Sequence, residues 1–211
     1  MKKTLLVTAL LLAAVSPAMA ARKQAPAQMP LTLKPLTTQK AITVSGEYIM
    51  FEDSRQDVSG YGVALSYDKA FAPLMENHYW SWNVGGFWNT GKIDAGNPGG
   101  EADEFTLIGA RLGLDANFVI APRTTIFMGP RVGYATYKEI VKVAGNQDVE
   151  NHNDSFTYGF NVGVRYLMPN GKWALEGGFS HTWYAQRQAG RENGVGSKES
   201  NTFYGGMSFS F

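Results

Sequence analysis

The chain contains no cysteine among its 211 residues. This absence excludes a lipoprotein anchor, a disulfide, a thiol nucleophile and a cysteine-ligated metal site. It leaves histidine, hydroxyl and carboxylate side chains as the groups on which any chemistry would depend.

A long apolar run is also missing after the first 20 residues. No later stretch reaches about 18 consecutive apolar residues, so we expect no membrane-spanning helix. The opening MKKTLLVTALLLAAVSPAMA has a basic start, a short apolar run and Ala18-Met19-Ala20 before an expected cleavage site. This pattern is typical of a secretory signal peptide over residues 1–20. If the exported chain enters a membrane, it must do so as strands, because only helices and closed barrels satisfy their backbone groups in hydrocarbon.

Neither sign of charge is in excess. The chain has 19 basic and 18 acidic residues, and without Lys2 and Lys3 17 basic residues face 18 acidic ones, a net charge of −1. This balance indicates neither nucleic-acid binding nor a polybasic membrane contact.

Residues 21–39 contain Pro26, Pro30 and Pro35, which break helices. We expect this segment to form a disordered, Pro-rich arm before a single domain at 40–211.

What the chain does contain, from Lys40 onward, is side-chain alternation with a period of two, the mark of β-strands. Eight such runs are present. They cover residues 41–51, 58–68, 78–90, 104–116, 124–137, 155–167, 172–184 and 201–211.

The two faces of these runs differ in a way that a soluble β-sandwich does not explain. In FTYGFNVGVRY, residues 156–166, large apolar residues alternate with glycine, asparagine and arginine. A sandwich would bury the large residues and expose a lysine-rich face, yet here the polar face has few lysines and many glycines. Glycine in a strand indicates close approach of another group, as occurs inside a narrow barrel. We therefore expect the apolar face to contact lipid.

Aromatic residues support this interpretation, because they gather at the strand ends. One set comprises Tyr67, Trp80, Tyr166, Trp173, Phe209 and Phe211, and the other comprises Trp88, Tyr134, Tyr158, Trp183 and Phe203. Two aromatic girdles around an apolar band are typical of outer-membrane barrels. The fold class expected is all-β: an eight-stranded antiparallel transmembrane up-and-down β-barrel.

The links between runs alternate in length. Residues 91–103, 138–154 and 185–200 are long and polar, 69–77 is intermediate, and NFVIAPRT and MPNGK are tighter turns. Outer-membrane barrels have long external loops and short periplasmic turns. This alternation predicts that both termini lie in the periplasm.

The C-terminal stretch YGGMSFSF, residues 204–211, carries a resemblance. Together with the eight runs it resembles small outer-membrane barrels of the OmpA/OmpX/opacity-protein type. The resemblance implies location in the outer membrane of a Gram-negative bacterium, without a cofactor. It also implies that Tyr204, Gly206, Phe209 and Phe211 form the assembly signal read by the barrel-assembly machinery.

Strand parity places six charged residues in the lumen: Glu47, Arg111, Asp115, Arg131, Arg165 and Glu176. An arginine facing lipid at mid-membrane would cost roughly 2–4 kcal/mol, which favours the inward assignment. We predict that Glu47 lies between Arg111 and Arg131, and that Glu176 lies near Arg165. Eight strands leave room for little more than side chains, so a filled lumen is favoured over a narrow channel.

His181, in GFSHTWYAQ, faces outward near the external rim. Lipid A deacylases of similar architecture resemble this arrangement, with His-x-Ser and a downstream acid. Here Trp183 stands at the serine position, although Glu192 and Glu199 could be the acid. The alternative is an interfacial histidine at lipopolysaccharide depth.

The run NQDVENHND, residues 146–154, could hold a divalent cation but lacks the EF-hand order, which favours a solvated loop.

Three functions follow in order of preference. The first is a non-enzymatic surface barrel that acts through its external loops in adhesion, binding of an external ligand or host factor, or envelope stability. The second is a lipid A-modifying enzyme that uses His181, and the third is a narrow channel. In each case outer-membrane lipid and lipopolysaccharide would surround the barrel.

Overall fold

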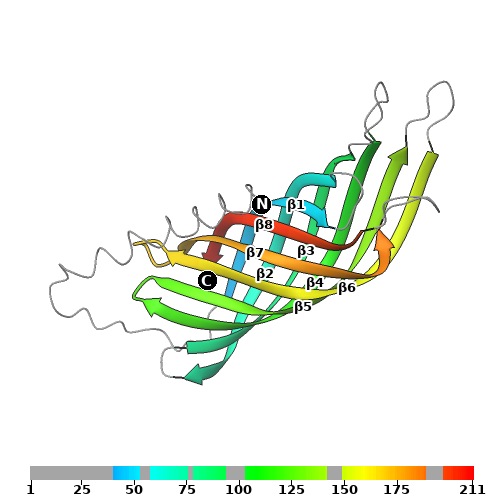
Figure 1. Ribbon diagram of the computed structural model, residues 1–211. Helices are drawn as coiled ribbons and strands as arrows, with labels where there is room; N and C mark the ends of the chain where they lie inside the picture. The colour runs from blue at the N-terminus through cyan, green and yellow to red at the C-terminus, as the bar shows by residue number, and fades with distance from the viewer. Residues whose placement is uncertain (1–39, 53–57, 76–77, 94–102, 142–148, 189–196) are drawn as a thin grey trace.

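The structure, a computed structural model, describes residues 40–52, 58–75, 78–93, 103–141, 149–188 and 197–211. They form eight antiparallel strands that follow one another around a closed ring (Figure 1). The strands are β1 Lys40–Glu52, β2 Val58–Met75, β3 His78–Ile93, β4 Asp103–Ala121, β5 Thr124–Val141, β6 Val149–Leu167, β7 Trp173–Gln188 and β8 Ser197–Ser210. Within these residues no helix is long and apolar enough to cross a membrane.

The ring closes between the first and last strands. β1 pairs with β8 from Ala41 opposite Ser210 to Glu52 opposite Glu199. At the end of this seam, the backbone N–H of Phe211 donates to the carbonyl of Lys40 at 3.0 Å. Closure leaves neither strand with an unpaired edge along the seam. The predicted fold class is confirmed.

The two ends of the barrel differ in their links. At the end where the chain enters β1 and leaves β8, here called the terminal end, the links are 76–77, 122–123 and 168–172. In the last of these turns, Asn170 Oδ1 accepts hydrogen bonds from the backbone N–H groups of Lys172 and Trp173, each at 3.1 Å. Gly171 has a φ of 70°, which glycine adopts without strain. The opposite end, here called the loop end, carries 53–57, 94–102, 142–148 and 189–196.

The barrel is inside out relative to a soluble protein. Outward residues such as Val44 and Leu65 are each 57% exposed, whereas the inward Ser45, Asn83 and Asn161 are buried. An exposed apolar surface of this extent is stable only against lipid.

Aromatic residues lie on this outer surface toward both ends. Near the loop end Tyr158 stacks on Trp183 with ring centroids 5.6 Å apart. Near the terminal end Trp173 packs on Phe209 at 4.9 Å. In each pair, both residues belong to the same girdle predicted from the sequence.

Several strands are longer than the alternation predicts. β2 continues through the predicted link 69–77 to Met75, with register shifts beside Pro73 that accommodate the missing N–H. The predicted loop 138–154 is wrong in part, because β5 and β6 remain paired up to Val141 opposite Val149. The predicted loops 91–103 and 185–200 likewise lose residues to β3, β4, β7 and β8. Strand pairing continues in these segments because it depends on backbone hydrogen bonds and does not require apolar and polar side chains to alternate.

Glycines on the two faces are expected to differ in their tolerance of a side chain. A Cβ on the inward Gly129 would fall on the backbone carbonyl of Leu114, whereas a Cβ on the outward Gly46 would meet no atom closer than 3.9 Å. We expect Gly129→Ala to lower the free energy of unfolding by roughly 1–3 kcal/mol. Gly46→Ala is the matched control and should leave it unchanged or slightly raised. Urea unfolding of both variants in the same detergent tests this, and equal midpoints would contradict the assigned faces.

Candidate functional site: a polar lumen and an outward histidine

The lumen contains all six charged residues that parity assigns to it, together with two more. Glu47 and Asp115 are buried, and the arginines Arg111 and Arg165 are mostly buried. The additions are Asp68 on β2 and Glu139 on β5, which are 8% and 7% exposed. Sequence reasoning missed Asp68 because it is the last residue of its predicted run, and missed Glu139 because it lies in the predicted loop 138–154.

Glu47 lies at the centre of the first polar group. Its Oε1 accepts from Arg111 Nη2 at 2.6 Å, and its Oε2 accepts from Asn89 Nδ2 at 3.1 Å. The guanidinium of Arg111 also lies 5.5 Å from the ring centroid of Phe87, within cation–π range. Contacts from β3 and β4 thus hold one buried carboxylate of β1.

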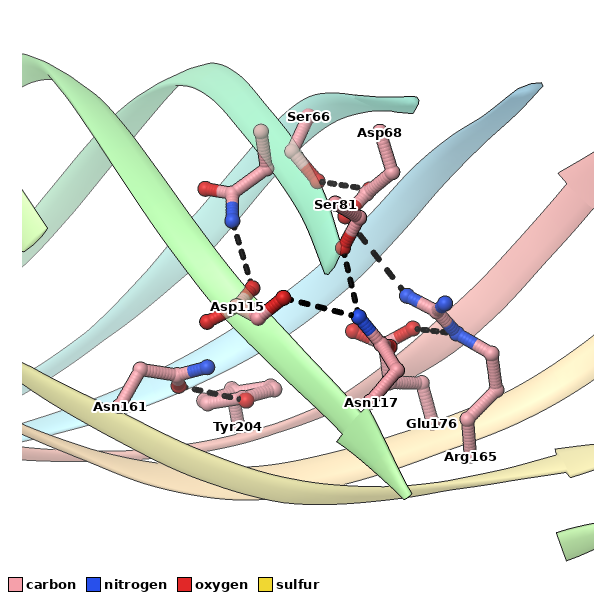
Figure 2. A network of polar contacts seen from close by, with 10 residues as sticks. Ser66, Asp68, Ser81, Asp115, Asn117, Asn161, Arg165, Glu176 and Tyr204 are labelled. Carbon is pink, nitrogen blue, oxygen red and sulfur yellow. Dashed lines mark hydrogen bonds and ion pairs between the residues drawn. The ribbon is translucent and has the colours of Figure 1, made fainter. Parts of the chain in front are cut away.

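Arg165 is the centre of a second group nearer the terminal end (Figure 2). Its Nε donates to Glu176 Oε2 at 2.8 Å, and its Nη2 lies 3.7 Å from Asp68 Oδ1. The guanidinium also faces the ring of Phe127, with its carbon 5.3 Å from the centroid. One arginine therefore joins β2, β6 and β7 across the lumen, as Figure 2 shows.

Amides and hydroxyls extend this second group. Asn83 Nδ2 donates to Asp115 Oδ2 at 2.6 Å, and Asn117 Nδ2 donates to Ser81 Oγ at 2.8 Å. The sequence prediction placed Asp115 among ion pairs, but the structure gives it an amide partner. Its other oxygen, Oδ1, is buried without a hydrogen-bond partner among the described residues.

The prediction that Glu47 lies between Arg111 and Arg131 is wrong for Arg131. No carboxylate oxygen of the described residues lies within 4.0 Å of its guanidinium. Its Nε is buried and has no hydrogen-bond partner among them. Glu47 uses its oxygens on Arg111 and Asn89 instead, which leaves Arg131 beside the pair rather than within it.

Toward the loop end the lumen turns apolar. Phe51 packs edge-on against Phe105 and Tyr137 at centroid distances of 5.5 and 5.9 Å. Ile49, Val58, Ile93, Leu107, Ala135 and Tyr184 complete this buried cluster, here called the apolar plug. Sequence analysis did not identify it, although inward parity at Ile49, Leu107 and Tyr137 was a usable signal.

Little space remains inside. Between the apolar plug and the Glu47 group lies a cavity of about 30 Å³, bordered by Ile49, Tyr184, Arg111 and Arg131. At the terminal end a wider cavity of about 590 Å³, bordered by Asp68, Tyr79 and Arg165, opens at the rim near Phe211. Tyr204 and Asn161 lie between these two cavities, joined by a 2.7 Å hydrogen bond (Figure 2). The lumen is therefore filled in its middle and toward the loop end, and it is open at the terminal end.

His181 faces outward on β7, as predicted from parity, and belongs to a chain of polar contacts. Its Nδ1 lies 2.8 Å from Asn201 Oδ1, and Asn201 Nδ2 donates to Glu52 Oε1. Its Nε2 lies 3.6 Å from Glu199 Oε2. Because Asn201 Oδ1 accepts, Nδ1 of the imidazole must carry a proton.

The surroundings of His181 lack a hydroxyl nucleophile among the described residues. The ring lies between Phe160 and Trp183, at centroid distances of 5.7 and 4.3 Å, and Ser180 is buried on the opposite face. Glu199 is the one predicted acid that can be placed, since Glu192 lies outside the described residues. The contacts of His181 orient its imidazole, and none of them is with a hydroxyl that could attack an acyl carbonyl.

The segment 146–154 is strand rather than loop from Val149 onward, and Asp148 lies outside the described residues. Glu150 Oε1 lies 2.7 Å from Lys138 Nζ and 2.5 Å from His152 Nε2. These two partners, Lys138 first, hold the pKa of the Glu150 carboxyl below its ordinary value. In the described part of the chain no three histidine or acidic side chains converge as a metal site would require.

Comparison with known proteins identifies the family. The model of the outer membrane protein beta-barrel domain matches residues 6–211. The chain belongs to the outer-membrane β-barrel family. Membership locates it in the bacterial outer membrane. No curated protein sequence matches the chain significantly.

Solved structures of outer-membrane barrels share the fold at low identity. Neisserial surface protein A is 14% identical with a TM-score of 0.55, over 82% of this chain and 97% of its own. A major outer membrane protein of Thermus thermophilus is 15% identical with a TM-score of 0.54, over 81% and 99%. Ail, the attachment invasion locus protein of Yersinia pestis, in complex with the heparin analogue sucrose octasulfate, is 10% identical with a TM-score of 0.50, over 82% and 98%.

Loss of one partner from the buried pair of Glu47 and Arg111 should lower stability far more than loss of one partner from an exposed pair. We expect Glu47→Leu or Arg111→Leu to lower the free energy of unfolding of this outer-membrane barrel by about 3–5 kcal/mol, because each substitution leaves a buried charge without its partner. The double variant should recover part of the loss. Glu150→Gln is the control, since its pair with Lys138 is exposed and should contribute little to stability. Urea midpoints measured in one lipid or detergent check this; unchanged midpoints in both single variants would contradict the pairing.

Proposed function

We propose that this outer-membrane barrel is a non-enzymatic surface protein that binds an external macromolecule with its loop end. In this proposal the loop end faces outward from the cell and both termini lie in the periplasm. The short turns at the terminal end support that orientation, since outer-membrane barrels place short turns in the periplasm.

The observation that carries the proposal is the filled lumen. The apolar plug covers the loop end of the interior, and the Glu47 and Arg165 groups fill the middle. A barrel closed in this way offers solutes no open path, and therefore its accessible working surface is its exterior.

The shape of the loop end supplies a surface for contact. β4 and β5 stay paired to Glu104 opposite Ile140, and β5 and β6 stay paired to Val141 opposite Val149. These pairs lie beyond the girdle residues Tyr134 and Tyr158 on the same strands. Three polar outward side chains are in contact there, namely Lys138, Glu150 and His152. A rigid sheet that carries polar groups past the membrane can present them to a partner without ordering a loop.

Two further partners belong to the proposal. Lipopolysaccharide would surround the outward aromatic residues near the loop end, including Tyr158 and Trp183. The barrel-assembly machinery would read the last strand, in which Phe209 and Phe211 face outward while Tyr204 faces the lumen.

One observation favours a second candidate, modification of lipid A. The Glu52–Asn201–His181 chain orients an imidazole at the outer surface, as a catalytic base requires. Trp183 in contact with the ring, where a nucleophile would be needed, opposes it. We rank it below surface binding for that reason.

Attachment of whole cells tests the leading proposal. Cells that express the chain should attach to surfaces coated with extracellular-matrix protein better than cells without it. A variant with Lys138, Glu150 and His152 all changed to serine should lose about tenfold of that attachment, as expected for contacts of about 1.4 kcal/mol. The control variant changes Arg123 and Lys172, at the terminal end, to serine. Equal attachment with and without the chain would contradict the proposal.

Two measurements separate the alternatives. We expect no conductance steps from the purified barrel in planar bilayers, since the plug and ion pairs fill the lumen. Mass spectrometry of lipid A should show the same acyl chains in cells with the wild-type chain, with His181→Ala and without the chain. A lost or added acyl chain that depends on His181 would instead establish the enzymatic function.

A further inference from the structure

The small cavity beneath the apolar plug is bordered by more positive than negative side chains. Its volume is about 30 Å³, room for about two water molecules. Arg111 and Arg131 both border it, while Glu47 is the one carboxylate among its lining residues. The local formal charge is therefore +1.

That charge is not cancelled by Glu47. Both carboxylate oxygens of Glu47 are engaged, one with Arg111 at 2.6 Å and one with Asn89 at 3.1 Å. Arg131 has no carboxylate within 4.0 Å among the described residues, and its Nε has no hydrogen-bond partner there. A buried guanidinium N–H without a hydrogen-bond acceptor, beside a second guanidinium, is unfavourable.

The other carboxylates lie elsewhere. Asp68 and Glu176 flank Arg165, Asp115 accepts from Asn83, and Glu139 is buried on β5 outside the cavity lining. The lumen thus has surplus negative charge near the terminal end and surplus positive charge at the cavity.

Hydroxyl groups form much of the rest of the lining, which also includes the apolar Ile49, Phe87 and Leu107. Hydroxyls of Thr157, Ser180, Thr182, Ser200 and Thr202 border the cavity, and the Tyr184 hydroxyl bonds to Ser200 Oγ at 2.9 Å. Hydroxyls can turn their protons toward an acceptor, so all of these groups suit an anion. The apolar plug, including Ile49 and Leu107, excludes bulk water from one side and strengthens electrostatic attraction there.

We propose that this cavity is a binding site for a small monovalent anion of halide size, held between Arg131 and Arg111. The anion neutralises the local charge and accepts from the guanidinium groups and the hydroxyls. A cavity of about 30 Å³, room for about two water molecules, suits a single small ion.

The direct test is crystallographic. Barrel refolded and crystallised with bromide as the sole halide should show an anomalous peak at the cavity, within hydrogen-bond distance of Arg131. Density for water alone at this position, or a direct contact of Arg131 with Asp115, would overturn the proposal. This test uses the wild-type chain and does not depend on any variant folding.

A second test measures thermal unfolding after refolding in chloride or in the bulky anion gluconate at equal ionic strength. We expect the midpoint to be about 3 °C higher in chloride. Arg131→Gln should abolish the difference, whereas Lys172→Gln, which removes a positive charge at the rim, should retain it. A difference that is absent in the wild type, or that persists in Arg131→Gln, would contradict the site.

Discussion

A strand in hydrocarbon can satisfy its backbone N–H and C=O groups only on a neighbouring strand. The pairing of β1 with β8 is therefore the contact on which the remaining structure depends. Once the ring is closed, one set of alternating side chains must meet lipid and the other must share a narrow interior. The exposed valines, leucines and aromatics, and the buried asparagines and serines, are consequences of that single constraint.

The interior meets a second requirement, since charges removed from water need partners. Glu47 and Arg111 form one group and Arg165, Glu176 and Asp68 another, with asparagines filling the remaining positions. Toward the loop end, aromatic packing replaces polar pairing. The polar groups fix the strands to one another, and the apolar plug separates them from the loop end of the barrel. Both features make the barrel a scaffold.

The proposed function uses the exterior of the barrel. The paired extension of β4, β5 and β6 carries polar groups beyond the girdle, while His181 brings polar contacts to the lipid-facing wall. These surfaces differ in chemistry. The first is solvated and can meet a macromolecule, and the second lies among aromatic rings where lipid packs.

Alternation by itself determined the number of strands, their faces and the inward placement of residues such as Arg111 and Arg165, because a period of two is a local property. It also indicated the outward direction of His181. The pairing of Arg131 could not be read in this way, nor could the apolar plug or the bond from Asn201 to His181. Those features depend on register and on which strands face each other across the lumen. Only the tertiary structure decided them, because a barrel brings together side chains that are far apart in the sequence.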